Sequence, residues 1–476
     1  MQFYSFIFLI FLIIGVSFYY LSNKSSYKKI LIIILNYAFY CYFDIRFAIL
    51  LFCITIINYL AGNFISENKN EKIKNLVFYS AILLNMLALG FFKYYNFFIE
   101  SFATLLNSFG FSSNLPTLNI LAPLGISYYI FQTLTYIFDL QYNSLEKKVP
   151  LIDYIIFSSF FPTIVAGPIE RASTLLPQIS SLKTFNKEFI KKGFALITIG
   201  MLRKLIIADP LGLVIGQIFS EPQYYKSVEI LIAIILYPIQ LYNDFAGYSS
   251  IARGVAKLFG FNIISNFKQP FFSKSIVEFW RRWHISFSFW LRDYLFTPFR
   301  LKYRDKGNLG IVYSIMLTFF ICGLWHGPTW GNVLWGLIHG FYLSSSVLTT
   351  NFRNKLREIF SLKDIYLNLL RSLFLFLMIV FSFLVARADS LNQVFYMLNS
   401  VLHWSYSELT LRFISILITG SSASFLVDYF ENKYKSQAFL MYLKPSFKYA
   451  LYLSLWVFFV LLFMTQNKLP FIYEKF

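Results

Sequence analysis

The stretch ICGLWHGPTWG, residues 321 to 331, decides how the sequence is interpreted, because it places a histidine at a helix break in a very apolar chain. Pro328 cannot donate a backbone hydrogen bond and disfavours helical geometry at Gly327. A helix arriving from Ile311 is therefore expected to end or kink at His326. At membrane depth, broken backbone is tolerated where it lines a cavity or is buried in protein. His326 is predicted either to face an internal chamber or to be satisfied by a neighbouring carbonyl in a helix bundle.

Glycines surround this histidine at helical spacing. Gly323, Gly327 and Gly331 recur every four residues, and Gly336 and Gly340 repeat the spacing. Small residues at this interval let neighbouring helices approach at backbone distance. Helix packing is the expected role of these glycines.

Composition predicts the fold class, an all-α polytopic membrane protein. The 476 residues are 57% hydrophobic, 21% aromatic and 14% charged, which leaves too little polar surface to solubilise a globule. We expect one domain over residues 1–476, a multi-helix bundle with broken or re-entrant helices around a central chamber. Apolar runs of spanning length cover residues 3–21, 30–66 (two segments), 75–98, 119–139, 228–242, 309–324, 330–348, 367–387, 411–428 and 449–464, with less regular ones at 151–166 and 193–218.

The net charge of +19 indicates membrane topology and contact with anionic lipid head groups, and nucleic acid is a poor partner for so apolar a chain. Lysines follow the first and third runs: Lys24, Lys28 and Lys29, then Lys69, Lys72 and Lys74. Both loops are predicted to be cytoplasmic, which places the N-terminus outside. The basic stretch 183–204 is expected to lie at the membrane interface.

Two interior elements carry polar groups. Residues 123–139 have polar side chains on an apolar background, which is typical of a helix that faces the bundle interior. Residues 160–171 hold two prolines and a glycine, which predict a broken or re-entrant element.

Asn243 and Asp244 interrupt another apolar run. Asp244 is expected either to pair with a nearby arginine such as Arg253 or to take part in the chemistry, and both residues are candidate substrate contacts.

A helix is predicted from Ser275 to Tyr294, since Ser275 and Glu278 form a capping box. Its tryptophans and aromatics fall on one face and its basic residues on another, as in an interfacial amphipathic helix. The basic face, with Arg281, His284, Ser288 and Arg292, could hold phosphates of a nucleotide-like acyl donor or lie against lipid phosphates. Contact with lipid is the favoured interpretation for Arg281 and Arg282, and the three arginines of this segment are candidate substrate contacts.

The sequence indicates no metal site and no bound cofactor. Cys41, Cys53 and Cys322 lie in apolar runs without paired spacing and are interpreted as small hydrophobic residues. No internal repeat and no phosphate-binding glycine loop is visible, which disfavours a transporter or an ATPase.

Together these stretches resemble the membrane-bound O-acyltransferases, in the bacterial branch that acylates glycans. The similarity is most specific in FWRRWH, residues 279–284, and in WHG, residues 325–327. It extends over residues 123–129, 161–171, 242–254, 266–298 and 323–340. The chain departs from the family pattern at Ser250, where an acidic residue is expected, and at residues 298–301.

By this resemblance, His326 takes the place of the family's essential histidine and His284 that of its second recurrent histidine, with Trp325 beside them as a candidate substrate contact. The donor implied is acetyl-coenzyme A, and a periplasmic O-acetyltransferase is implied as partner. The implied location is the bacterial inner membrane.

The C-terminal residues 465–476 resemble a tyrosine motif of this branch, in which the hydroxyl of Tyr473 would carry the acyl group. Lysines before the last apolar run place this tail outside, so both termini are predicted to be periplasmic. Nine residues separate Met464 from Tyr473 and can extend roughly 30 Å, while the bilayer midplane lies about 15 Å from its edge. The alternative is an aromatic anchor at the interface.

The sequence therefore predicts an enzyme that moves an acetyl group across the membrane, through His326 and Tyr473, for O-acetylation of an envelope glycan. Peptidoglycan ranks first, alginate or another exopolysaccharide second, and teichoic acid D-alanylation third. A transporter or flippase of acylated intermediates, or a membrane platform for a periplasmic enzyme, are the alternatives from other classes.

Overall fold

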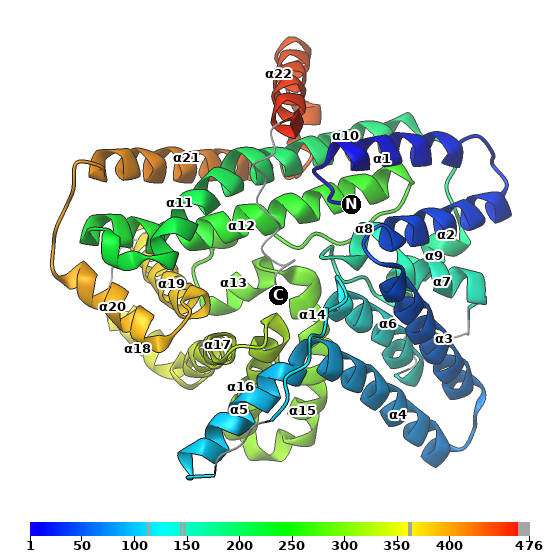
Figure 1. The fold of residues 1–476 in the computed structure, drawn as a ribbon, viewed down its shortest axis with the longest axis horizontal. Helices are drawn as coiled ribbons and strands as arrows, with labels where there is room; N and C mark the ends of the chain where they lie inside the picture. The colour runs from blue at the N-terminus through cyan, green and yellow to red at the C-terminus, as the bar shows by residue number, and fades with distance from the viewer. Residues whose placement is uncertain (112–114, 143–144, 146–148, 360–363, 465–476) are drawn as a thin grey trace. The chain divides into compact units, whose positions relative to one another are not determined.

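The computed structural model describes residues 1–111, 115–142, 145, 149–359 and 364–464, and within these residues it contains helices and no β-strand (Figure 1). The prediction of an all-α protein is confirmed. The chain forms two compact units: Met1–Ile197 with Ile251–Ile264, and Thr198–Ser250 with Ser265–Phe476. The expectation of a single domain stays a prediction.

Seven helical segments in the described part of the chain are long and apolar enough to cross a membrane, which supports a multi-pass membrane protein. They are Ile45–Glu67, Glu71–Ser108, Ser227–Leu258, Arg304–His326, Tyr366–Arg387, Thr410–Tyr434 and Pro445–Phe463. The run at residues 3–21 forms a helix of only 14 residues, Phe6–Tyr19, and the run at 119–139 becomes helical only at Ile126. Those two runs were predicted as longer helices than the structure has.

The first unit is built around a completely buried helix. Its elements are α1 (Phe6–Tyr19), α2 (Ser25–Cys41), α3 (Ile45–Glu67), α4 (Glu71–Leu89), η1 (Gly90–Tyr94), α5 (Tyr95–Ser108), α6 (Ile126–Gln141), α7 (Leu151–Ser159), α8 (Phe161–Ile164), α9 (Ala172–Ser180) and most of α10 (Lys187–Met201). Every side chain of α6 from Ile126 to Leu140 is buried. Gln132 donates a hydrogen bond to the Phe157 carbonyl and Asp139 accepts one from the Ser173 backbone, so the predicted interior-facing polar helix is confirmed.

The predicted break within residues 160–171 is present. Helix α7 ends at Ser159 and the four-residue α8 follows. The Asn36 amide joins the two, donating to Ser159 Oγ at 3.1 Å and accepting from the Phe161 backbone at 3.0 Å. A buried amide thus replaces backbone hydrogen bonds that Pro162 and the turn remove.

Two of the lysines assigned to a loop lie inside α2 instead. Lys28 is 1% exposed and donates to the Lys183 carbonyl at 2.9 Å, and Lys29 forms an ion pair with Asp153 at 2.5 Å. Their charges therefore serve contacts within the first unit. They could not be distinguished from topology-setting loop lysines in the sequence, because their partners are more than 100 residues away.

The second unit holds the remaining elements. They are η2 (Leu202–Ala208), α11 (Asp209–Ser220), η3 (Pro222–Tyr224), most of α12 (Ser227–Leu258), η4 (Pro270–Phe272), α13 (Ile276–Arg282), α14 (Ile285–Leu291), η5 (Arg292–Phe296), α15 (Thr297–Lys302), η6 (Arg304–Lys306), α16 (Gly307–His326), α17 (Trp330–Leu348), α18 (Thr350–Ile359), α19 (Asp364–Arg387), α20 (Leu391–Leu402), α21 (Thr410–Tyr434), η7 (Phe439–Tyr442) and α22 (Pro445–Met464).

Helices α16 and α17 cross at backbone distance. A Cβ on Gly323 would lie 2.5 Å from the Asn332 carbonyl oxygen, and one on Gly336 would clash with the Phe319 carbonyl and with Gly323 itself. The packing role predicted for the glycines is confirmed at this pair. Only glycine fits here, because any side chain would push the two helices apart.

We expect Gly336→Ala to lower the thermal unfolding midpoint of the purified protein, since overpacking a tight contact costs about 1–3 kcal/mol. Gly216, in the interior of α11, meets no atom within 4 Å of an added Cβ. Gly216→Ala is the matched control and should leave the midpoint unchanged or raise it, because alanine is favoured over glycine in a helix by about 1 kcal/mol. Equal midpoints for the two variants would contradict the packing argument.

Candidate functional site

His326 lies at the broken end of α16, as predicted. Helix α16 ends at His326, the Gly327 N–H bonds to the Leu324 carbonyl at 3.2 Å, and α17 begins at Trp330. Thr329 caps α17, because its hydroxyl accepts a hydrogen bond from the Asn332 backbone N–H at 3.2 Å. The Gly327–Pro328 break therefore turns the chain directly into a new, capped helix.

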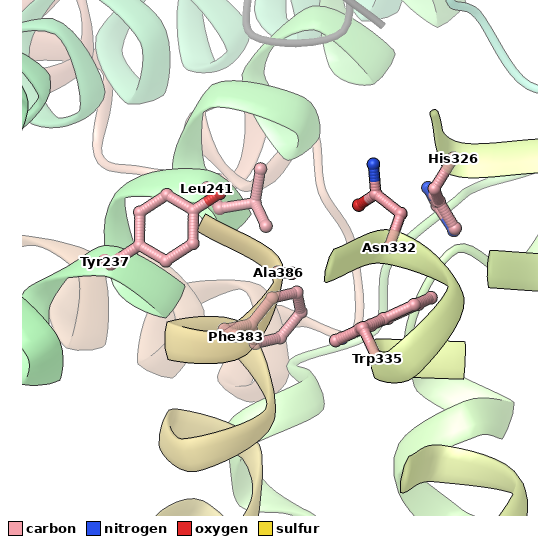
Figure 2. Close-up of a pocket in the computed structure, with 7 residues that line it drawn as sticks. All are labelled: Tyr237, Leu241, His326, Asn332, Trp335, Phe383 and Ala386. Carbon is pink, nitrogen blue, oxygen red and sulfur yellow. The ribbon is translucent and has the colours of Figure 1, made fainter. Parts of the chain in front are cut away.

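The His326 side chain lines a small pocket of about 30 Å³ (Figure 2). Helices α12, α16, α17 and α19 supply the lining residues Tyr237, Leu241, His326, Asn332, Trp335, Phe383 and Ala386. His326 is 8% exposed. The pocket has room for about one or two water molecules, and the choice between an internal chamber and a neighbouring partner for His326 stays a prediction.

Aromatic rings enclose the histidine on its other sides. The ring centroids of Trp335, Trp325 and Phe287 lie 4.8, 5.0 and 5.6 Å from that of His326. Trp325 is buried and stacks on Phe287 at 4.1 Å. An apolar enclosure keeps bulk water from the imidazole and strengthens any hydrogen bond formed there.

His284 is brought close to His326, at 6.4 Å between ring centroids. It is fully buried, with its ring 4.7 Å from that of Phe245 and stacked on Phe287 at 4.9 Å. Burial, together with the nearby charge that His326 could carry, lowers the pKa of His284 well below its usual range. His284 is therefore a neutral imidazole beside the pocket.

The prediction of one continuous helix from Ser275 to Tyr294 is wrong. Ser275 does cap α13, accepting from the Glu278 N–H at 3.2 Å, but the helix stops at Arg282. His284 then adopts left-handed backbone angles, φ 43° and ψ 53°, which are strained for a residue with a side chain. The interfacial description is also wrong, because the predicted apolar face is buried in the unit: Trp280, Trp283, Phe287, Trp290 and Tyr294.

Asn266 holds this break in place. Its backbone carbonyl accepts from the Ile285 N–H at 2.9 Å, and its side-chain oxygen accepts from the Ser286 hydroxyl at 2.6 Å and the Ser286 N–H at 3.3 Å. These bonds satisfy the first turn of α14 and so fix the position of His284. Sequence reasoning missed this role, although Asn266 begins one of the stretches that carry the family resemblance.

The predicted arginines do not line the pocket described above. Arg281 is exposed, Arg282 pairs with Glu278 at 2.6 Å, and Arg292 pairs with Asp293 at 2.6 Å. These contacts account for two of the three guanidinium groups within the fold. A role in binding an acyl donor stays a prediction for all three.

Asn243 and Asp244 lie in α12, the helix that also carries Tyr237 and Leu241 of the pocket, and they belong to a buried ionic network. Asp244 pairs with Lys204 at 2.7 Å, and Lys204 also pairs with Asp209 at 2.8 Å, so the predicted partner Arg253 is replaced by a lysine of η2. Asn243 accepts from Arg203 at 3.0 Å. Arg203 and Lys204 were predicted to lie at the membrane interface, but both are 1% exposed.

Arg203 extends the network to α21. Its guanidinium bonds to Asp428 at 2.5 Å and to Glu431 at 2.9 Å, and the Tyr242 hydroxyl donates to Asp428 at 2.8 Å. Removing one partner of such a buried pair leaves an uncompensated charge, which destabilises a fold by about 3–5 kcal/mol. The network thus ties α12 to α21, and the substrate role predicted for Asn243 and Asp244 stays a prediction.

His339, one turn beyond Trp335, has a defined tautomer. The Trp280 indole N–H donates to Nδ1 at 3.3 Å, and an indole nitrogen can only donate. The proton of the neutral ring is therefore on Nε2, which donates to Ser382 Oγ at 3.0 Å, while that hydroxyl donates to the Ile379 carbonyl. His339 is a satisfied core histidine and is not among the pocket-lining residues.

The remaining predictions concern a metal site, the cysteines and Tyr473. Within the described residues no group of three or more histidine, cysteine or acidic side chains could hold a metal ion, and Cys322 is buried. Tyr473 lies outside the described residues. Asn332 and Trp335, which the sequence analysis did not single out, are the pocket's additional polar groups on α17.

Residues 30–388 match the model of the membrane-bound O-acyltransferase family. A protein named "probable alginate O-acetylase AlgI" from Pseudomonas putida is 33% identical over 84% of this chain and 80% of its own length. The peptidoglycan O-acetyltransferase of Helicobacter pylori is 28% identical over 68% of this chain and 65% of its own length. The teichoic acid D-alanyltransferase of Bacillus subtilis is 34% identical over 48% of this chain and 60% of its own length.

Proposed function

Because the chain belongs to the membrane-bound O-acyltransferase family, we propose that it transfers an acetyl group from acetyl-coenzyme A across the inner membrane for O-acetylation of a cell-envelope glycan. The observation that carries this proposal is the position of His326, an ionisable side chain at a helix break, facing a small pocket in an aromatic enclosure. Such a group inside a membrane protein is expensive to keep unless it is used.

His326 is the general base of the proposed reaction. The acceptor hydroxyl gives its proton to the imidazole as its oxygen attacks the thioester carbonyl carbon, and the carbonyl electron pair moves onto oxygen. The intermediate collapses, the carbon–sulfur bond breaks, and the imidazolium returns the proton to the departing thiolate. An ester and free coenzyme A result.

The neutral state of His284 supports this assignment. A second positive imidazole 6.4 Å away would disfavour the imidazolium that His326 must become. Since burial keeps His284 uncharged, His326 can accept a proton without that repulsion. His284 also supplies part of the ring enclosure through its contact with Phe287.

Tyr473 is the proposed acyl carrier on the outer side, with both termini in the periplasm. A free phenol has a pKa of about 10, so about one part in a thousand is ionised at pH 7 and a general base is needed. A tyrosyl ester keeps much of the transfer potential of a thioester, because phenolate is a good leaving group. A separate periplasmic O-acetyltransferase would then pass the acetyl group to the glycan.

Peptidoglycan, the acceptor ranked first from the sequence, has a strong competitor. The relatives named as alginate O-acetylases match 84–89% of this chain, against 68% for the peptidoglycan O-acetyltransferase. This longer match favours an exopolysaccharide as the second candidate acceptor.

His326→Ala should lower acetyl transfer from labelled acetyl-coenzyme A by about 10²–10⁴-fold, the usual contribution of a general base. The matched control is His403→Ala, since His403 is exposed and its Nδ1 contacts the Asn399 carbonyl. That variant should keep full activity, and both should unfold near the wild-type temperature. Retained transfer in folded His326→Ala protein would remove His326 from the chemistry.

Tyr473→Phe should abolish covalent label on the C-terminal peptide after incubation with labelled acetyl-coenzyme A, because the variant lacks the hydroxyl that forms the ester. Peptide mapping by mass spectrometry measures this. Tyr406→Phe, at a 76% exposed tyrosine, is the control and should label as the wild type does. Full glycan acetylation by Tyr473→Phe would refute the carrier role.

Deleting the gene should remove alkali-labile acetate from one glycan fraction. Acetate released from purified peptidoglycan and from exported polysaccharide, in the deletion strain and its complemented parent, distinguishes the two candidate acceptors. Loss from the wall fraction supports peptidoglycan, and loss from the exported fraction supports an exopolysaccharide. Unchanged acetate in both fractions would contradict glycan acetylation.

A further inference from the structure

Trp335 is a buried hydrogen-bond donor that lacks an acceptor within the described part of the chain. Its side chain is 3% exposed and lines the pocket, with its ring 4.8 Å from that of His326. Buried polar atoms in native proteins nearly always have a partner, and an unpaired one is unfavourable. An unpaired indole N–H on a residue that lines the pocket points to a partner supplied by a ligand.

Asn332 is the neighbouring polar group, three residues earlier and therefore on the same face of α17. It is 4% exposed and lines the pocket from the first turn of the helix (Figure 2). The cap at Thr329 fixes this turn through the Asn332 backbone N–H. The first turn of a helix also carries a partial positive charge, which favours a negative group nearby.

We propose that Asn332 and Trp335 donate hydrogen bonds to the oxyanion formed when the acceptor hydroxyl attacks the thioester, an inference that rests on the proposed function. As the new carbon–oxygen bond forms, the proton moves to His326 and the carbonyl electron pair becomes a negative charge on oxygen. The amide N–H of Asn332 and the indole N–H of Trp335 bind that oxygen. When the carbon–sulfur bond breaks, the charge leaves with the sulfur and the carbonyl is restored.

The arrangement of the pocket favours these two donors over the other lining groups. Leu241, Phe383 and Ala386 have no polar side-chain atom, and Tyr237 comes from α12, on the opposite side of the pocket from His326 (Figure 2). Asn332 and Trp335 instead come from the helix that begins four residues after His326. Base and donors therefore lie on either side of one tight turn and line the same pocket.

The test is Trp335→Phe, which removes the N–H and keeps an aromatic ring in the enclosure. We expect kcat for coenzyme A release from acetyl-coenzyme A, measured with the purified full-length protein supplied with the periplasmic O-acetyltransferase and its glycan, to fall about 10²-fold, as for other oxyanion donors. KM for acetyl-coenzyme A should stay within about twofold, because the donor acts on charge that develops only in the transition state.

The matched control is Trp456→Phe. Trp456 is a tryptophan of α22 whose indole N–H already donates to Thr198 at 3.0 Å, and it does not line the pocket. This variant should keep the wild-type kcat. Thermal unfolding of both variants reports on folding; Trp335→Phe loses no hydrogen bond within the described residues, so its destabilisation comes from the smaller ring alone.

A second variant keeps the test decisive if Trp335→Phe does not fold. Asn332→Leu retains the side-chain volume and the backbone bond to Thr329 but has no amide, and it should also lower kcat with little change in KM. A folded variant of either residue with wild-type kcat, or with a change in KM alone, would overturn the proposal. Failure of the wild type to release coenzyme A would instead refute the proposed function itself.

Discussion

The tight crossing of α16 and α17 is the constraint on which the site depends. Gly323 and Gly336 bring the two backbones into contact, so the end of one helix and the start of the next are held in a fixed relation. His326 closes α16, and Asn332 and Trp335 stand in the opening turns of α17. A wider crossing would separate His326, the proposed base, from these groups. The glycines would thus affect the proposed chemistry through helix spacing, although neither of them lines the pocket.

Several buried charges of the second unit are paired with one another. The fixed charges of Arg203, Lys204 and Asp244 are paired within a buried network that joins η2, α12 and α21. Buried pairs contribute little net stability, but they specify one arrangement of the helices, since breaking a pair is costly. Beside the pocket, His284 is neutral because of burial. A neutral His284 does not repel the positive charge that His326 would take up in the proposed reaction.

Much of the helical fold could be predicted from the sequence, because apolar runs and proline breaks are local signals. The span 330–348 coincides with α17, and the end of α16 at His326 follows from Gly327 and Pro328 alone. The break at His284 could not be predicted, since neither proline nor glycine marks it and the Asn266 side chain that stabilises it acts from 20 residues away. The ionic partner of Asp244 was missed for the same reason: Lys204 is 40 residues earlier, while Arg253 is close in sequence. Local sequence patterns do not identify the partner of a polar side chain when that partner is far away along the chain.

Three locally unfavourable features lie close to the His326 side chain. His284, a non-glycine residue with left-handed backbone angles, has its ring 6.4 Å from that of His326. Trp335, a buried donor with no acceptor in the described residues, has its ring 4.8 Å away. His326 itself ends a helix at a proline break. Each is unfavourable by itself, and the surrounding packing must hold it in place. A sequence selected only for stability would remove them, because a glycine at position 284 or a phenylalanine at 335 would relieve the strain or the unpaired donor. That they occur together, at the pocket, is the physical reason for assigning the acyl-transfer chemistry here and not to the better satisfied His339.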